Sequence, residues 1–273
     1  MRLLSTLPAG RGDAAPAIVL LHGYLCLMPR AYWLGLGPMR RALAARGIPV
    51  VVARAPRTGG VAVRANVVAR QLVGLRQRRL VLVGHSMGGL EARYLASRLD
   101  RERRIARVIT LGTPHGGTVA AEWVLSGRGW PAALLRLLDR GALRDLTRDG
   151  AHALDRLMPD RGDVAYRAVA GHFPAAALEG AIADVAAQVE VVEGDNDGVV
   201  SLRSARRWLA PITVNAHHLG LIGQRMRRGP DRAGAASDPP TGLLTRLLLA
   251  ELAALPRPPA ADFCRHRADS VRA

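Results

Sequence analysis

Lysine is absent from this sequence, and cysteine and aromatic residues are scarce. All 39 basic residues are arginine, 4% of the 273 residues are aromatic, and the two cysteines are Cys26 and Cys264. Two cysteines are too few for the disulfide framework of a small secreted domain. The hydrophobic fraction of 49% is too high for a disordered chain. The class that remains is a globular protein, long enough to bury a large core.

Long hydrophobic runs are missing as well. The longest candidate, residues 243–255, is interrupted by Thr245, Arg246 and Glu251 and is shorter than the ~18 residues that span a bilayer. Residues 1–10 have no apolar core of the length that a signal peptide needs. We therefore expect a cytoplasmic protein without a transmembrane segment, or a secreted one if its amino terminus has been trimmed.

Acidic residues are in the minority, with 22 against 39 basic residues and a formal net charge of +17. Such a balance attracts phosphate groups non-specifically. The arginines are nevertheless spread along the chain, with local clusters at residues 101–107 and 225–228, and few aromatic rings are present to stack on bases. We expect no dedicated nucleic-acid binding, and at most peripheral contact with anionic lipid interfaces.

Short apolar runs alternate with longer amphipathic stretches over the first two thirds of the chain. This rhythm is typical of an α/β fold, in which a mostly parallel central sheet is flanked by helices. The predicted strands are residues 17–21, 48–53, 80–83, 107–111, 164–169, 189–193 and 212–214, and the predicted helices are residues 31–46, 61–77 and 90–99.

A helical insertion is expected where this rhythm changes. Residues 118–160 contain short helical patches, such as 134–138 and 151–158, and no strand-like run. They are predicted to form a cap or lid on a domain of residues 1–228, which is followed by a flexible linker (229–241), a helix (243–255) and a loose tail. The apolar side chains of the cap either line an acyl pocket or pack the cap on the body; they include Trp123, Val124, Leu125, Trp130, Leu134 and Leu138.

A serine motif joins a predicted strand to a predicted helix. Residues 84–88 read G-H-S-M-G, which fits the pattern G-x-S-x-G. In this context the hydroxyl of Ser86 stands clear of the sheet at a helix N-terminus, where a developing negative charge is favoured. The alternative interpretation is a glycine-rich turn whose serine only caps the helix.

A serine nucleophile needs a base, and that base needs a carboxylate, in the chain order Ser, Asp or Glu, His. Asp195 and Asp197 follow the predicted strand 189–193, and His217 and His218 follow the predicted strand 212–214. Side chains at the carboxyl ends of parallel strands meet at one edge of a sheet. The residues alone leave both aspartates and both histidines open, with an Asx turn and a helix cap as the alternative roles.

An oxyanion hole requires two backbone N–H donors. One is the N–H of Met87, directly after the serine, and the other comes from the loop after an early strand. Residues 22–24 occupy that place, so Tyr24 is the expected second donor, with Gly23 allowing the tight turn. We expect His22 to shape this loop and not to act as a base.

Five segments together resemble the α/β-hydrolases of the bacterial true-lipase type, the Pseudomonas and Burkholderia triacylglycerol lipases. They are residues 20–24, 83–89, 111–117 (L-G-T-P-H-G-G), 196–201 and 218–219, and they cover about residues 16–220. The resemblance implies the α/β-hydrolase fold, Asp197 as the triad acid and His218 as the base, and no cofactor. Those lipases hold a calcium ion through an aspartate two residues after the histidine; Gly220 stands there in this chain, so we expect no metal.

These residues predict a serine hydrolase that cleaves carboxylic esters, a lipase or esterase, through an acyl-enzyme on Ser86. Two alternatives stay open. One is an acyltransferase, or a hydrolase of lipid-linked or polymeric esters, on the same triad. The other is a non-catalytic α/β-hydrolase-like protein that serves in binding.

Overall fold

The computed structural model describes residues 15–24, 26, 28–127, 139–208, 211–224 and 241–255. Within them the chain forms a six-stranded sheet in the order β2-β1-β3-β4-β5-β6, and every neighbouring pair of strands is parallel. Because parallel strands all end at one edge, the loops that follow them meet there. The strands are β1 (Ala17–Leu21), β2 (Val50–Val52), β3 (Leu80–His85), β4 (Ile105–Leu111), β5 (Ala165–His172) and β6 (Ile212–Asn215).

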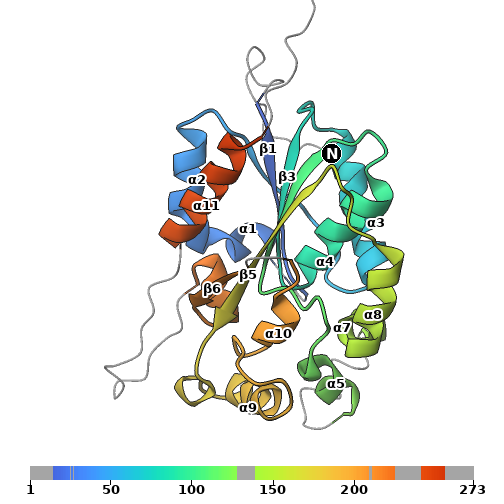
Figure 1. Ribbon diagram of the computed structural model, residues 1–273, viewed down its shortest axis with the longest axis vertical. Coiled ribbons are helices and arrows are strands. Elements are labelled where there is room, and N and C mark those ends of the chain that lie inside the picture. Colours follow the sequence, from blue (N-terminus) through green and yellow to red (C-terminus); the bar gives the residue numbers. More distant parts are fainter. Residues whose placement is uncertain are drawn as a thin grey trace, which may run out of the picture.

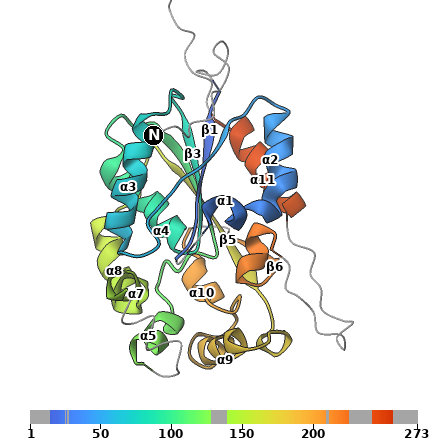
Figure 2. The ribbon, with the colours of Figure 1, turned by 180° about the vertical axis from the view of Figure 1, so that it is seen from behind.

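Helices cover both faces of this sheet (Figures 1 and 2). All five side chains of β1 are buried, which explains its uninterrupted apolar run. Ile18 and Leu20 belong to the core on one face, and Val19 and Leu21 belong to the core on the other. The first face is covered by α1 (Pro29–Tyr32), α2 (Gly37–Ala44) and α11 (Thr241–Ala253), and the second by α3 (Val61–Val73) and α4 (Met87–Tyr94).

The predicted α/β class is confirmed, but one predicted strand is wrong. Residues 189–193 form the last turns of α9 (Ala181–Glu193). Their run V-E-V-V-E alternates like a strand, yet the preceding residues are helix formers and the helix continues through the run. Ala186 and Val189 are three residues apart and both fully buried, whereas Val191 is exposed, as expected for one face of a helix.

The predicted cap contains three described helices, α5 (Val119–Leu125), α7 (Arg140–Leu146) and α8 (Arg148–Leu157). Each begins at a side chain that caps it: Thr118, Asp139 and Thr147 accept hydrogen bonds from N–H groups of their first turns. Residues 128–138 lie outside the described part of the chain, and so do the predicted linker up to residue 240 and the tail after residue 255. Among the described helices, none has the length and hydrophobicity to cross a membrane.

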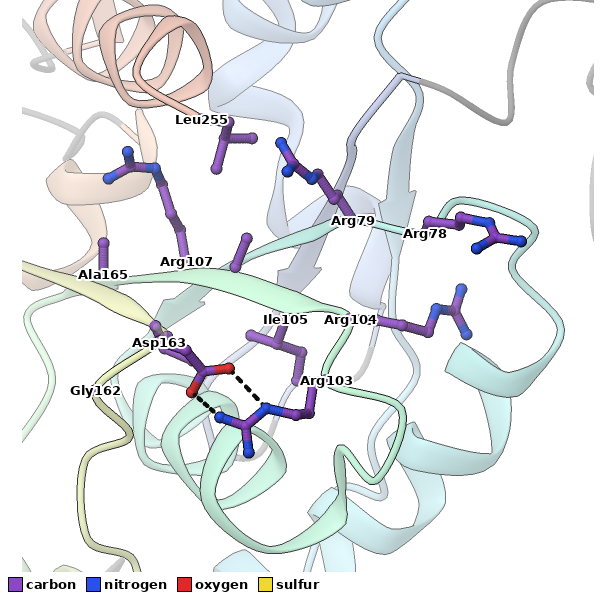
Figure 3. Close-up of a pocket in the computed structure, with 12 residues that line it drawn as sticks. Arg78, Arg79, Arg103, Arg104, Ile105, Arg107, Gly162, Asp163, Ala165 and Leu255 are labelled. Atoms are coloured by element: carbon purple, nitrogen blue, oxygen red, sulfur yellow. Dashed lines mark hydrogen bonds and ion pairs between the residues drawn. The ribbon is translucent and has the colours of Figure 1, made fainter. Parts of the chain in front are cut away.

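Helix α11 is tied to the sheet by a buried carboxylate. Glu251 accepts hydrogen bonds from Arg107 on β4 and, at 2.8 Å, from Arg167 on β5. Beside this contact is a hollow of about 540 Å³ at the amino ends of β3, β4 and β5 (Figure 3). Its lining includes Arg78, Arg79, Arg103, Arg104 and Arg107. Three arginines of the cluster at residues 101–107 therefore lie at the sheet edge opposite the one where the strands end, whereas residues 225–228 lie outside the described part of the chain.

Candidate active site

Ser86 lies on a strained turn between β3 and α4. Its backbone has φ 54° and ψ −129°, a left-handed conformation that is rare for a residue with a side chain. The turn is possible because glycines stand two residues before and two residues after Ser86. A Cβ at Gly84 would collide with the Gly88 carbonyl, and a Cβ at Gly88 would collide with the Leu21 carbonyl on β1. The sequence motif thus folds into a tight elbow pressed against the adjacent strand.

The alternative role for Ser86, a helix cap, is not what its side chain does. Ser86 precedes the first residue of α4, but its hydroxyl makes no capping hydrogen bond. Thr118, Asp139 and Thr147 all make such a bond in the same chain. A strained backbone that leaves the serine hydroxyl uncommitted is typical of a reactive residue.

Asp197 and His218 form a close pair. His218 Nδ1 is 2.7 Å from Asp197 Oδ2, and the His218 backbone N–H donates to the Asp197 carbonyl, also at 2.7 Å. The other carboxylate oxygen of Asp197 accepts from the N–H groups of Val199 and Val200 at 3.0 and 2.8 Å. The Asp197 side chain is 1% exposed. The carboxylate is therefore buried, satisfied and fixed, and it orients the ring of His218.

The other two candidates are placed differently. The Asp195 side chain is 69% exposed, and His172 Nε2 lies 3.8 Å from its Oδ1. His217 caps the short helix 218–222, because its Nδ1 accepts from the Gly220 N–H at 3.2 Å, and its ring packs on Phe173. The structure brings together the pair that the family resemblance implied. His217 has the alternative cap role, whereas the Asx turns are made by Asn196 and by Asp197 itself, whose side-chain oxygens accept from the N–H groups two residues further on.

Asp197 reaches the sheet edge by a route that the sequence did not predict. It was expected to leave a strand at residue 193, but that segment is the end of α9, as described above. The loop instead returns from the helix to the end of β5, where the Phe173 N–H donates to the Asn196 carbonyl at 2.8 Å. A Cβ at Gly171 would lie 2.9 Å from the Asp197 Cβ. The carboxylate is thus held at the carboxyl edge by its contact with β5.

The predicted oxyanion loop lies directly against the elbow. A Cβ at Gly23 would be 3.0 Å from the Ser86 Cβ, which places this loop beside the nucleophile. Met87 is the first residue of α4, so its N–H belongs to the turn whose donors have no partner inside the helix. His22 is fully buried and its Nδ1 lies 2.9 Å from the Gly23 carbonyl, in keeping with a loop-shaping role. Burial and the nearby Asp139 raise the pKa of the Tyr24 hydroxyl to about 12.

Three residues to which the sequence motifs assigned no role support this loop, directly or through one another: Tyr32, Arg64 and His85. The Tyr32 hydroxyl lies 2.5 Å from His85 Nδ1, and His85 Nε2 lies 2.8 Å from the His218 carbonyl. Arg64 is fully buried on α3 and contacts the carbonyls of His22 and Gly23. The sequence did contain an indication for Arg64. It stands among the apolar, core-facing positions of a predicted helix, and a buried charge there requires a partner.

The predicted cap residues are only partly described. Trp123, Val124 and Leu125 are half-buried on α5, whose buried side chains include Ala121, packed with α4 and α8. Trp130, Leu134 and Leu138 lie outside the described residues. Contact of these side chains with a substrate stays a prediction. No cluster of three or more metal-ligating side chains occurs in the part of the chain that the structure describes.

Buried neutral histidines predict a stability that falls with acid. Burial lowers the pKa of His85 and of His115 well below the usual 6.5; His218 adds to the effect at His85, and Arg93 and Arg207 add to it at His115. Below pH 6.5 the unfolded chain binds these protons and the folded chain does not, so each histidine lowers the free energy of unfolding by about 1.4 kcal/mol per pH unit. Urea unfolding at pH 7.5, 6.5 and 5.5 measures this slope.

The variant His115→Gln is the control for this slope, because it removes one of the histidines with a lowered pKa and should make the decline shallower. Glu91, whose pKa burial raises to about 7, acts in the opposite direction in both proteins and cancels in the comparison. Equal slopes in the two proteins would contradict the prediction.

Comparisons with known proteins agree with this architecture. Residues 54–178 match the family model of the alpha/beta hydrolase fold. The mature form of a Bacillus licheniformis lipase superposes with a TM-score of 0.68 at 21% identity, covering 88% of this chain and 92% of that one. A metagenomic carboxyl esterase superposes with a TM-score of 0.66 at 20% identity, covering 91% and 79%.

A curated protein is also similar to part of the chain. Triacylglycerol lipase 2 of Saccharomyces cerevisiae is 32% identical over 111 residues, which are 37% of this chain and 33% of the yeast protein. The chain therefore matches about a third of the length of this relative.

Proposed function

We propose that this chain, which has the α/β-hydrolase fold, is a serine hydrolase that cleaves carboxylic esters. The observation that carries the proposal is the uncapped Ser86 on its strained elbow, at the sheet edge that also holds the His218–Asp197 pair. The similarity to lipases and to a carboxyl esterase supports an ester as the substrate.

The proposed mechanism has two half-reactions. Ser86 Oγ attacks the ester carbonyl while His218 takes the hydroxyl proton, and the N–H groups of Tyr24 and Met87 stabilise the oxyanion. His218 then returns the proton to the departing alcohol, which leaves an acyl group on Ser86. Water, deprotonated by His218, attacks this acyl group, and the carboxylic acid departs as Ser86 recovers its proton. Asp197 keeps the His218 ring in one orientation throughout.

An apolar, lipid-like ester is the substrate class that the surroundings of the site favour. The exposed side chains of Met28, Leu34 and Leu219 lie beside the elements that carry Tyr32 and His218. These elements are packed together, because Gln224 Nε2 donates to the Tyr32 carbonyl at 3.1 Å. Exposed apolar side chains beside these elements suit contact with acyl chains or a lipid aggregate. The arginine-lined hollow of Figure 3 is at the opposite sheet edge, so an anionic surface bound there would not face the triad.

A fluorophosphonate probe tests the proposed nucleophile. We expect it to label the wild-type chain at one serine and not to label Ser86→Ala, because Ser86 is the serine that we propose His218 activates. Ser97→Ala, a change in the turn after α4, is the matched control and should label fully. Absence of labelling in the folded wild type would favour the alternative of a non-catalytic binding protein.

p-Nitrophenyl esters of increasing chain length then test the substrate class. A preference for longer acyl chains supports a lipid ester, whereas a rate that is independent of chain length would contradict it. Adding a primary alcohol and analysing the products distinguishes hydrolysis from the alternative of acyl transfer, since only a transferase would form the new ester in preference to the acid.

A further inference from the structure

A directional chain of hydrogen bonds connects the oxyanion loop to the base. The His218 carbonyl can only accept, so the 2.8 Å contact requires that His85 Nε2 carries a proton. His85 is fully buried and neutral, which leaves its Nδ1 as an acceptor for the Tyr32 hydroxyl at 2.5 Å. The Tyr32 oxygen in turn accepts from the Gly23 N–H at 3.2 Å. Every donor along this path has one acceptor, and the tautomer of His85 is fixed.

Arg64 holds the next peptide of the same loop, which joins Gly23 to Tyr24, by its carbonyl group. The Gly23 carbonyl accepts from Arg64 Nη2 at 3.1 Å, and the same nitrogen reaches the His22 carbonyl at 3.2 Å. Arg64 is itself fixed by Glu91 on α4, at 2.6 Å, and both side chains are fully buried. Arg64 Nη1 also contacts the carbonyls of Pro56 and Arg57, so all three nitrogens of the guanidinium are held.

These two anchors determine the direction of the Tyr24 N–H. In a trans peptide the C=O and N–H groups point in opposite directions, and no cis peptide bond occurs among the described residues. Arg64 holds the Gly23 carbonyl on the α3 side, so the Tyr24 N–H of that peptide points away from α3. Tyr32 holds the Gly23 N–H, so the peptides on both sides of Gly23 are anchored and its φ and ψ angles are fixed.

We propose that Tyr32 and Arg64 are positioning residues that hold the Gly23–Tyr24 peptide so that its N–H meets the oxyanion formed at Ser86. The inference rests on the proposed function and adds to it the residues that align the hole. Neither side chain touches the substrate. Glycine at position 23 permits this close approach, since a Cβ there would lie 2.7 Å from the Tyr32 hydroxyl.

The test uses Tyr32→Phe, which removes one hydroxyl and keeps the ring. Loss of an oxyanion-hole donor costs about 10²–10³ in rate, so a misaligned donor should lower kcat by roughly 10- to 100-fold. KM for a short p-nitrophenyl ester should stay within about twofold, because the ground-state carbonyl depends little on the hole. Tyr166→Phe is the matched control: its hydroxyl also accepts one backbone N–H, from Arg161 at 3.0 Å, but near the start of β5. It should leave kcat unchanged.

A thionoester substrate distinguishes a misaligned oxyanion hole from a general loss of structure, because only the former changes the preference for the oxygen ester. Sulfur is a weak hydrogen-bond acceptor, so a working oxyanion hole prefers the oxygen ester to its thiono analogue. We expect this preference to fall by about tenfold in Tyr32→Phe and also in Arg64→Lys, whose single ammonium group lacks the fork that reaches two carbonyls and Glu91. Circular dichroism at the assay temperature confirms that each variant is folded; if Arg64→Lys is not, Tyr32→Phe decides alone.

The outcomes separate the two proposals. An active wild type with an unchanged ester-to-thionoester preference in Tyr32→Phe overturns this inference and leaves the proposed function standing. A fall in kcat that leaves this preference unchanged also overturns it, because it indicates a structural role only. A wild type that hydrolyses neither substrate, and in which no serine is labelled by the fluorophosphonate, overturns the proposed function and this inference with it.

Discussion

Replacing Asp197 with asparagine is expected to lower kcat by about 10⁴-fold while the fold is preserved. An amide of the same shape can present its NH₂ group to His218 Nδ1, where the carboxylate presents an acceptor at 2.7 Å. The ring would then hold its proton on the nitrogen that should accept one from Ser86. The N–H groups of Val199 and Val200 can still bind the amide oxygen, so little of the loop should move. Steady-state kinetics with a p-nitrophenyl ester measures the effect.

Asp195→Asn is the paired control for this experiment. Asp195 is two residues away, largely exposed, and 3.8 Å from His172 rather than bonded to the base. We expect its kcat within about twofold of the wild type. A large loss in Asp195→Asn, with little change in Asp197→Asn, would reverse the assignment of the triad acid.

Replacing Gly84 with alanine is expected to destabilise the fold by about 3 kcal/mol or more. The added methyl group would meet the backbone of Gly88 and Gly89 on the first turn of α4. Backbone atoms cannot rotate away as a side chain can, so the elbow must open or α4 must shift from β3. The helix packs on the sheet through Ala92 and on the cap through Met87 and Leu90, all fully buried, which makes the shift costly. Urea unfolding monitored by circular dichroism measures the loss.

Gly162→Ala provides the matched control, because it makes the same chemical change where nothing lies within 4 Å of the new Cβ. Restricting the unfolded chain at such a position is neutral or slightly stabilising, by up to about 1 kcal/mol. Equal unfolding free energies for Gly84→Ala and Gly162→Ala would show that the elbow is not as closely packed as the structure indicates.

The strands that are buried on both faces were predictable from the sequence, because burial alone decides which residues they contain. Residues 17–21 and 80–83 are buried on both faces, so their side chains are all apolar and the run ends at a glycine or histidine. Residues 189–193 failed because valine alternating with glutamate has the period of a strand only when the neighbouring residues are ignored. The seven residues before them are rich in alanine and extend the same helix.

The predicted site residues were identified through local motifs and chain order, whereas their supports were not. Ser86, Asp197 and His218 each stand in a short recognisable string. Tyr32 and His85 are 53 residues apart, and Arg64 and Glu91 are 27 apart, in segments whose patterns otherwise indicate core. Nothing in a single sequence says which buried polar side chains become partners, because the pairing is set by how α1, α3 and α4 pack on the sheet.

The contact between α11 and the sheet has a consequence for the order in which the protein matures on the ribosome. Arg107 is nearly buried on a central strand, and the carboxylate that neutralises it belongs to Glu251, 144 residues later in translation. Until Glu251 has emerged from the exit tunnel, a nascent chain that has formed the sheet holds the Arg107 guanidinium without its counter-charge. The amino-terminal half can collapse early, but Arg107 and Arg167 gain their shared carboxylate partner only when the last described helix emerges.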